Sequence, residues 1–190
     1  MGPLLLLQDL TTGISIMNFF YTMNSTSAQS QFCMIWRSNL TFKNITLVVP
    51  LGVGIFYIQY KSQLIIQNFT ISNFVCSTSD NGGIFSVNSN SSLIANTISI
   101  NDVTMESLMY VDSSNFTINN SQILNFRNKF IYSGLKSYIY IQNSNFANSN
   151  LYLNSHSFTA IDLENDVSFH IFNCSFVNLS TSQNGPVKNK

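Results

Sequence analysis

Charged residues are scarce in this sequence. Lys and Arg supply 8 of the 190 residues, Asp and Glu supply another 8, and the formal net charge is zero. A surface that binds nucleic acid needs a stripe of Lys or Arg to neutralise phosphates, and the sequence contains no such stripe. The composition therefore argues against a nucleic-acid partner. It leaves amides and hydroxyls, including those of 26 Asn residues, to form the polar surface.

Long apolar runs are missing as well. The stretch Leu4–Leu7 has no basic residue before it and soon meets Asp9, whereas the core of a secretory signal contains about 7 to 15 apolar residues. No run approaches the roughly 18 apolar residues that a membrane span requires. We therefore expect no membrane span within this chain.

Cysteine and histidine are also rare, with three Cys and two His in the chain. No Cys-x-x-Cys pair occurs, and neither His156 nor His170 has a second His or Cys at the spacing of metal ligands. The sequence thus predicts no metal site and no cofactor. Cys33 lies beside alternating apolar residues, whereas Cys174 follows an Asn of the repeat described below and should face outward, so we do not expect these two to pair.

What the chain does contain is a repeat of about two dozen residues. Its template is clearest at Ile139, Ile141, Asn143, Phe146 and Asn148, where two alternating apolar residues precede an Asn, and a further apolar residue and a second Asn follow. Seven variants occur, and the one at the N-terminus matches least well. The residues at their first Asn position are Asn18, Asn44, Asn68, Thr97, Asn120, Asn143 and Asn173.

A period of this length indicates a solenoid, and apolar residues at spacing two indicate strands with one buried face. Additional apolar runs, such as Ile55–Ile58 and Leu108–Val111, supply a third short strand in each repeat. We therefore predict an all-β, right-handed parallel β-helix of about six to seven coils over residues 1–190. Residues 1–38 form the least regular coil and a linker, and residues 179–190 form a polar tail. Because repeat arrays normally carry polar caps and this chain begins with apolar residues, we expect a fragment of a larger repeat protein.

Equivalent residues of successive coils stack about 4.8 Å apart. A side-chain amide carries both a donor and an acceptor, so identical Asn residues can form hydrogen bonds up and down the stack. Thr97 can continue such a stack only in part. We predict a buried structural ladder at Asn44, Asn68, Thr97, Asn120, Asn143 and Asn173.

This Asn-bearing turn between short strands, repeated over residues 40–178, resembles the asparagine ladder of the pectate lyase-like right-handed β-helices. The Gly82-Gly83-Ile84 segment, with the Phe-x-Asn triplets at 146–148 and 176–178, is similar to the repeat of polymorphic outer membrane proteins and adhesin-type β-helices. It departs from that repeat because Gly-Gly occurs once and Asn follows Phe by two places rather than three. The bias toward Asn, Ile, Phe and Tyr resembles large repetitive surface proteins of ciliates and other protists. These resemblances imply the fold and do not fix the activity.

Many enzymes with this fold act on polysaccharides, and the resemblance implies clustered acidic residues in such a case. The acids nearest one another are Asp162, Glu164 and Asp166. Asp162 and Glu164 alternate with Ile161 and Leu163 and so should point outward from one strand. Asp112 occupies the same strand position two coils earlier. A solvated strand surface is the favoured interpretation of Asp112, Asp162 and Glu164, and a catalytic or glycan-binding role is the alternative.

The single Trp lies in another alternating segment. Phe32, Met34 and Trp36 are spaced by two, which predicts a strand that ends at Arg37. Aromatic residues at this spacing usually fill the buried face of a sheet. We therefore predict that Trp36 belongs to the core rather than to a ligand platform.

Asn-x-Ser/Thr triplets suggest where the protein is located. Since Asn44, Asn68 and Asn173 are assigned to the buried ladder, the credible glycan acceptors are Asn24, Asn90 and Asn115. They give mild support to an extracellular or cell-surface location. We expect a non-catalytic structural or adhesion segment of a cell-surface protein, whose partners are a surface glycan or protein and neighbouring coils of a longer chain. Polysaccharide binding or degradation is the alternative function.

Overall fold

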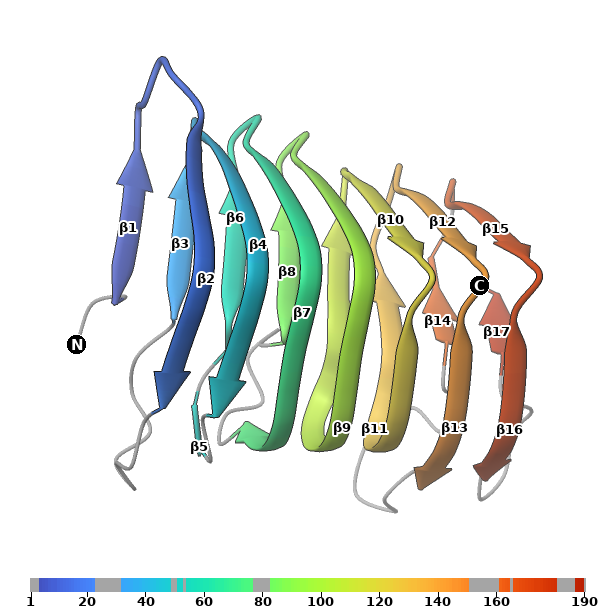
Figure 1. Ribbon diagram of the computed structural model, residues 1–190. Helices are drawn as coiled ribbons and strands as arrows, with labels where there is room; N and C mark the ends of the chain where they lie inside the picture. Colours follow the sequence, from blue (N-terminus) through green and yellow to red (C-terminus); the bar gives the residue numbers. More distant parts are fainter. Residues whose placement is uncertain are drawn as a thin grey trace.

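The computed structural model describes residues 4–22, 32–48, 51–52, 54–76, 83–150, 161–164, 166–180 and 187–189. These residues contain seventeen strands and no helix, and every strand pairing is parallel (Figure 1). The strands are β1 (Leu5–Gln8), β2 (Ile14–Thr22), β3 (Cys33–Trp36), β4 (Asn39–Val48), β5 (Leu51–Gly52), β6 (Phe56–Gln59), β7 (Gln63–Cys76), β8 (Phe85–Asn88), β9 (Ser92–Asp112), β10 (Asn115–Asn119), β11 (Gln122–Ser133), β12 (Tyr138–Gln142), β13 (Asn145–Asn150), β14 (Ile161–Leu163), β15 (Ser168–Phe172), β16 (Ser175–Ser180) and β17 (Val187–Asn189).

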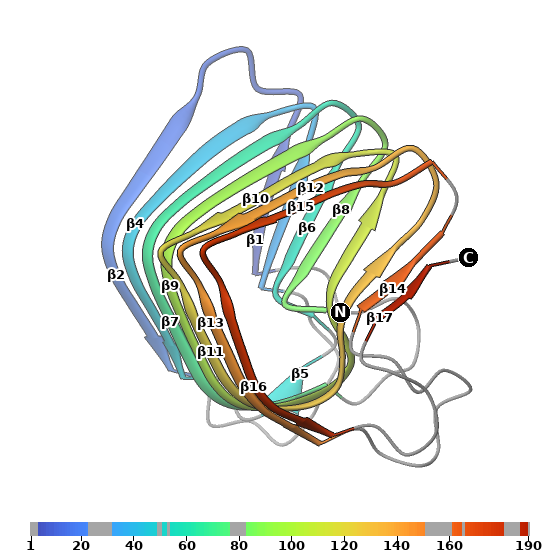
Figure 2. The ribbon, with the colours of Figure 1, turned by 90° about the vertical axis from the view of Figure 1, so that its right-hand side faces the viewer.

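The chain winds as a right-handed coil, as predicted. In Figure 1 the strands β3, β6 and β8 run upward behind, and β2, β4, β7 and β9 run downward in front, while the chain advances from left to right. Figure 2, along the axis, shows three sides. Side 1 contains β1, β3, β6, β8, β14, β17 and the ends of β9 and β11. Side 2 contains β10, β12, β15 and the first parts of β2, β4, β7 and β9. Side 3 contains β13, β16, the first part of β11 and the segments that follow side 2 in the longer strands.

The predicted repeat positions stack in register. Pairings join Ile14 to Leu40, Leu40 to Leu64 and so on through one inward row that is seven coils deep. This row comprises Ile14, Leu40, Leu64, Leu93, Phe116, Ile139 and Phe169. Even the N-terminal repeat, the poorest match in sequence, pairs Tyr21 with Leu47 as the template requires. The apolar alternation therefore determined the register of every coil.

Inside the coil the apolar side chains form one continuous core. Phe56 and Phe85 stack with ring centroids 5.5 Å apart, and both also contact the ring of Phe69. All three are fully buried, and such burial stabilises the fold by about 1.5–3 kcal/mol for each side chain. The last coil is covered less well, because Ile171, in register with the buried Ile141, is 41% exposed.

The Asn ladder exists, but its predicted burial is wrong. The first Asn position of each repeat is exposed and forms the corner between sides 2 and 3. All seven corner residues have positive φ angles of 48–57°. Asn is among the few non-glycine residues that adopt this left-handed conformation readily. The repeat therefore needs Asn mainly for the backbone turn, which directs the side chain outward.

These exposed amides still bond along the stack. Asn44 Nδ2 donates to Asn18 Oδ1, Asn68 Nδ2 donates to Asn44 Oδ1, and Asn173 Nδ2 donates to Asn143 Oδ1, each at 2.8 Å. Every bond points from a coil to the coil before it. Thr97 interrupts the row, as expected from its shorter side chain.

Serine forms a second stack that the repeat template did not include. Five buried serines precede the first strand of side 2 in successive coils: Ser38, Ser62, Ser91, Ser114 and Ser137. Ser62 Oγ accepts the backbone N–H of Ser38, and Ser91 Oγ accepts that of Ser62, at 3.3 and 3.2 Å. These hydroxyls satisfy backbone groups that would otherwise be buried without partners.

The coils differ in length mainly along one edge. Side 3 runs directly into side 1 within β11, which makes the coil from Asn120 to Asn143 a short one. In the next coil residues 151–160 separate β13 from β14, and the interval from Asn143 to Asn173 is longer for that reason. Between side 1 and the Asn corner the length changes little: Asn143 follows Ile131 by 12 residues, whereas Asn120 follows Met109, the partner of Ile131, by 11.

Candidate functional site

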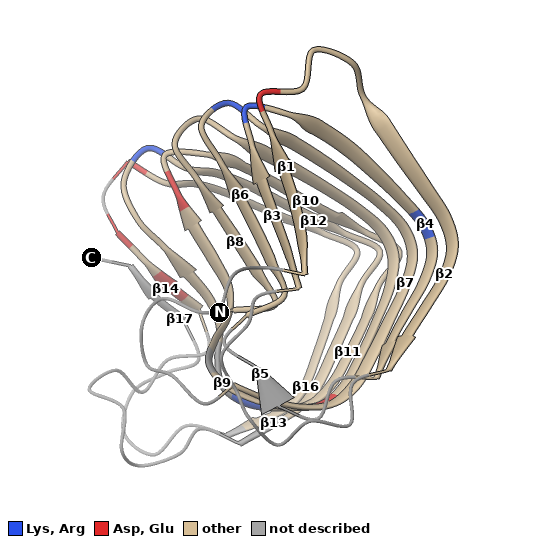
Figure 3. Cartoon of the chain, turned by 90° about the vertical axis from the view of Figure 1, so that its left-hand side faces the viewer, with Lys and Arg blue, Asp and Glu red and all other residues tan. Residues whose placement is uncertain are grey.

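Two regions of the outer surface bring chemically distinctive side chains together. One is a group of tyrosines and carboxylates on side 1, at the C-terminal end of the coil. The other is a hollow at the corner between sides 1 and 2, near the N-terminal end. Charged residues are sparse elsewhere on the chain (Figure 3).

The carboxylate group contains the three acids that the sequence singled out. Asp162 lies on β14, in register with Tyr132 of β11, which is itself in register with Tyr110 of β9. Glu164 follows β14 directly, and Asp112 ends β9. The sequence interpretation missed the two tyrosines, although their alternation with buried residues was visible in each strand.

Hydrogen bonding joins Glu164 to the tyrosines. The Tyr132 hydroxyl donates to Glu164 Oε1. This bond is the main reason that the pKa of Tyr132 is raised, and burial and the nearby negative charges raise it further. Tyr110 stacks on Tyr132 with ring centroids 5.4 Å apart and planes 14° apart. The pKa of Tyr110 is raised too, first by burial and then by the charges of Asp112 and Glu164.

Asp162 does not lie on a solvated surface, and that prediction is wrong. The residue is only 1% exposed. Strand β14 pairs with β11 on one edge and with β17 on the other, so Asp162 lies in register between Tyr132 and Lys188. A neighbour on each side explains burial that the alternation of one strand cannot reveal.

Asp112 is held apart from Glu164. A Cβ atom placed on Gly134 would lie 2.6 Å from Asp112 Oδ1, so the carboxylate fills the space that glycine leaves open. Gly134 lies between Asp112 and Glu164 in the same outward row, which makes the two acids two strand spacings, about 9.6 Å, apart. In the described part of the chain, no three His, Cys, Asp or Glu side chains gather to hold a metal ion.

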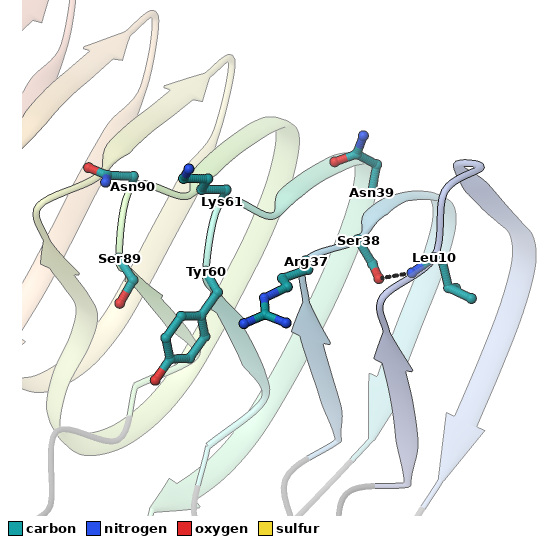
Figure 4. Close-up of a pocket in the computed structure, with 8 residues that line it drawn as sticks. All are labelled: Leu10, Arg37, Ser38, Asn39, Tyr60, Lys61, Ser89 and Asn90. Atoms are coloured by element: carbon teal, nitrogen blue, oxygen red, sulfur yellow. Dashed lines mark hydrogen bonds between the residues drawn. The ribbon is translucent and has the colours of Figure 1, made fainter.

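The corner hollow has a volume of about 640 Å³ and a different chemistry. Figure 4 shows its lining, which comprises Leu10, Arg37, Ser38, Asn39, Tyr60, Lys61, Ser89 and Asn90. Five of these residues have positive φ angles, because the chain turns here from side 1 to side 2 in each coil. The lining contains two cations and no acid.

Trp36 lies next to this hollow, and the prediction that it belongs to the core is wrong. On β3 the inward residues are Cys33 and Ile35, whereas Met34 and Trp36 are half-buried on the outer side. Pairing of Ile35 with Ile58 fixes this register. The Trp36 ring stacks on Tyr60 with centroids 4.2 Å apart and planes 20° apart.

The predicted glycan acceptors have different environments. Asn24 lies outside the described residues, whereas Asn90 and Asn115 are exposed. The ladder asparagines of the remaining triplets were excluded as buried. They are exposed instead, and their amides bond to neighbouring coils.

Cysteine and histidine occupy separate places. Cys33 is fully buried, and burial raises the pKa of its thiol to about 12. The expectation that Cys174 faces outward is wrong. It directly precedes Ser175, as Ser144 precedes the pairing partner Asn145, and it packs against the core. Its thiol lies 3.6 Å from the Ile141 carbonyl oxygen, and the residue is half-buried. His170 is exposed and lies 5.4 Å from the Tyr138 ring, while His156 lies outside the described residues.

Among the residues that the structure describes, none belongs to a helix with the length and apolar character needed to cross a membrane. No family model, curated protein or solved structure matches the chain. The resemblances to pectate lyase-like and adhesin-type β-helices therefore rest on the repeat pattern. What the fold establishes is the coarser statement: the chain is a parallel β-solenoid with a ladder of asparagine side chains.

Proposed function

We propose that the chain is a non-catalytic interaction segment of a cell-surface protein, and that its outer surface binds a glycan or a protein partner. The solenoid serves as a rigid support that holds polar side chains at regular spacing. Further coils of a longer chain are the expected neighbours along its axis.

The observation that carries this proposal is the ordered, uncharged outer row on side 3. In the first coil this row begins with the exposed Phe20. From the second coil onward its members, joined in register, are Thr46, Thr70, Ser99, Gln122, Asn145 and Ser175. These six are all exposed or half-buried hydroxyls and amides. Such groups both donate and accept hydrogen bonds, so a row of them about 4.8 Å apart suits a hydroxyl-rich or amide-rich partner. Because these side chains carry no charge, the free-energy cost of removing water from them when a partner binds is small.

Binding and turnover measured together test the proposal. A fluorescently labelled chain is applied to a panel of immobilised glycans, and the release of new reducing ends or unsaturated products is followed on the same panel. We expect retention on at least one glycan without any product. Absence of binding to every glycan and to intact cell surfaces would refute the proposal.

Location is tested separately through glycosylation. Expression through a eukaryotic secretory pathway should give a chain whose mass falls on glycosidase treatment. We expect Asn90→Gln and Asn115→Gln each to remove part of that mass difference. An exported chain with no glycan at either position would remove this support for a surface location.

A second candidate, polysaccharide degradation on side 1, is supported by the spacing of two acids. Asp162 and Glu164 are two residues apart along one strand, which corresponds to about 6.6 Å and falls within the roughly 6.5–9.5 Å separation of inverting glycosidases. Against this role, Asp162 is buried and Glu164 accepts a hydrogen bond from Tyr132. Turnover that disappears in an Asp162→Ala variant would establish it, and no turnover on the glycan panel would exclude it.

A further inference from the structure

The corner hollow is built by three successive coils. Arg37 follows β3, Tyr60 and Lys61 follow β6, and Ser89 and Asn90 follow β8. Backbone hydrogen bonds connect these turns, since Lys61 N–H donates to Ser89 O at 3.0 Å. The position of each side chain is therefore set by the stack rather than by an isolated loop.

The two cations of the hollow leave most of their donors unused. Arg37 forms one ion pair, in which Nη1 lies 3.3 Å from Asp9 Oδ1 and both side chains are at least half exposed. Such exposed pairs are weak, about 0–1 kcal/mol. A guanidinium carries five N–H donors, so Arg37 can bind a second anion while it contacts Asp9. Lys61 is exposed and forms no ion pair in the described part of the chain.

An aromatic ring and neutral polar groups complete the lining. Tyr60 is 42% exposed, although one face of its ring stacks on Trp36. Asn39 and Asn90 contribute exposed amides to the lining (Figure 4). Apolar rings combined with a few placed donors are typical of sites for small polar ligands.

We propose that this hollow binds an acidic sugar unit, with its carboxylate or sulfate group held by Arg37 and Lys61 and its ring edge against Tyr60. Arg pairs well with planar or tetrahedral oxyanions because its donors are arranged in a fork. The hydroxyls of the sugar contact Asn39 and Asn90. This site rests on the proposed function, in which a glycan is a partner, and it specifies where that glycan binds and which charge it carries.

The backbone conformation of the hollow allows substitutions that remove one side chain without disturbing the fold. Arg37, Tyr60 and Lys61 have φ angles of 47°, 58° and 63°, a conformation that Asn adopts more readily than their own side chains do. Arg37→Asn, Lys61→Asn and Tyr60→Asn should therefore retain the fold while each removes one ligand contact. Lys136→Asn is the matched control, because Lys136 has a φ of 55° at the same corner three coils after Lys61, outside the hollow.

The probes are carboxymethyl-dextran, dextran sulfate and unmodified dextran, which share one backbone and differ in charge. Affinity is measured by biolayer interferometry at two salt concentrations. We expect one of the two charged polymers to bind, dextran to bind at least tenfold more weakly, and each of the three hollow variants to lose about tenfold in affinity. Asp9→Asn should tighten binding, since it removes the acid that competes for Arg37. The control Lys136→Asn should bind like the parent chain.

The outcomes separate this inference from the proposed function. Charged dextran that binds equally to the parent, Arg37→Asn and Lys61→Asn chains would overturn the hollow as the site while leaving glycan binding intact. Binding that falls as much in Lys136→Asn as in Lys61→Asn would also overturn it, because attraction by net charge would then suffice. A chain that binds neutral glycans only would keep the proposed function and refute the acidic ligand. A chain that binds no glycan would refute the acidic-sugar site, and the proposed function would fail with it only if binding to intact cell surfaces were absent as well.

Discussion

Replacement of Thr97 by Asn should stabilise the solenoid. Thr97 has a φ of 57° and occupies the ladder row between Asn68 and Asn120. A β-branched residue in this conformation is an outlier, and the strain relative to Asn is about 1 kcal/mol. An amide at this position should also donate to Asn68 Oδ1, which adds about 0.5 kcal/mol because the bond is exposed to water.

The sum is about 1.5 kcal/mol, and a domain of this size shifts its melting temperature by roughly 2–4 °C for each kcal/mol. Calorimetry should therefore show a midpoint about 3–6 °C higher for Thr97→Asn. Thr97→Gly separates the two contributions, since glycine relieves the strain without supplying an amide. As a control, Thr70→Asn on the exposed face of β7 should be neutral or slightly destabilising, because Asn is a poor strand residue. A midpoint that is unchanged or lower for Thr97→Asn would refute the role assigned to the corner conformation.

Three further predictions concern side chains inside and beside the coil. Ser91→Ala removes the acceptor of the buried Ser62 N–H and should lower the free energy of unfolding by about 1–3 kcal/mol, as measured by urea titration; no loss would contradict the role of the serine stack. Glu164→Ala removes the hydrogen-bond acceptor that is the main cause of the raised pKa of Tyr132, so ultraviolet difference titration should show this tyrosine ionising at lower pH. A raised pKa in the folded state stabilises the protein below the ordinary tyrosine value of about 10, and this contribution is lost as the pH rises. The variant should therefore lose less stability above pH 10 than the parent chain does. Identical pH profiles of stability for the two chains would contradict this prediction. Cys33, whose pKa is about 12, should react with a thiol reagent only after denaturation, and rapid reaction of the native chain would show that β3 is not buried as described.

The sequence predicted the coil well because in-and-out alternation is a local property of a strand. Ile139 and Ile141 alternate in the sequence and both lie fully buried in the structure. The pairing register between successive coils was predictable as well, since a shift by one residue would expose the entire apolar row. The fold and the stacking of equivalent positions were therefore predictable from the sequence.

The chemistry of the outer surface was less accessible. A repeated Asn is compatible with an interior amide ladder and with a left-handed corner, and only the φ angle of Asn143, 48°, distinguishes them. Trp36 was assigned to the wrong face because Phe32, Met34 and Trp36 alternate as regularly as Cys33 and Ile35 do. Burial of Asp162 depends on two neighbouring strands that are distant in sequence. The burial and orientation of these side chains depend on the strands of neighbouring coils, which the sequence of a single strand does not specify.

Coil length varies most between sides 3 and 1, and this asymmetry gives the two halves of each coil different evolutionary freedom. Within the paired strands the residue count is fixed, because a single insertion there would turn buried side chains outward. One-residue differences fall instead in the turn between sides 1 and 2, where Arg37 in one coil is replaced by Tyr60 and Lys61 in the next. Between β13 and β14 the chain accommodates residues 151–160 where β11 needs no insertion, while the rows above and below remain paired. New sequence can therefore be acquired along this edge, coil by coil, without repacking the core. In such a solenoid the edge is a site for diversification, and the corners and core preserve the structure that carries it.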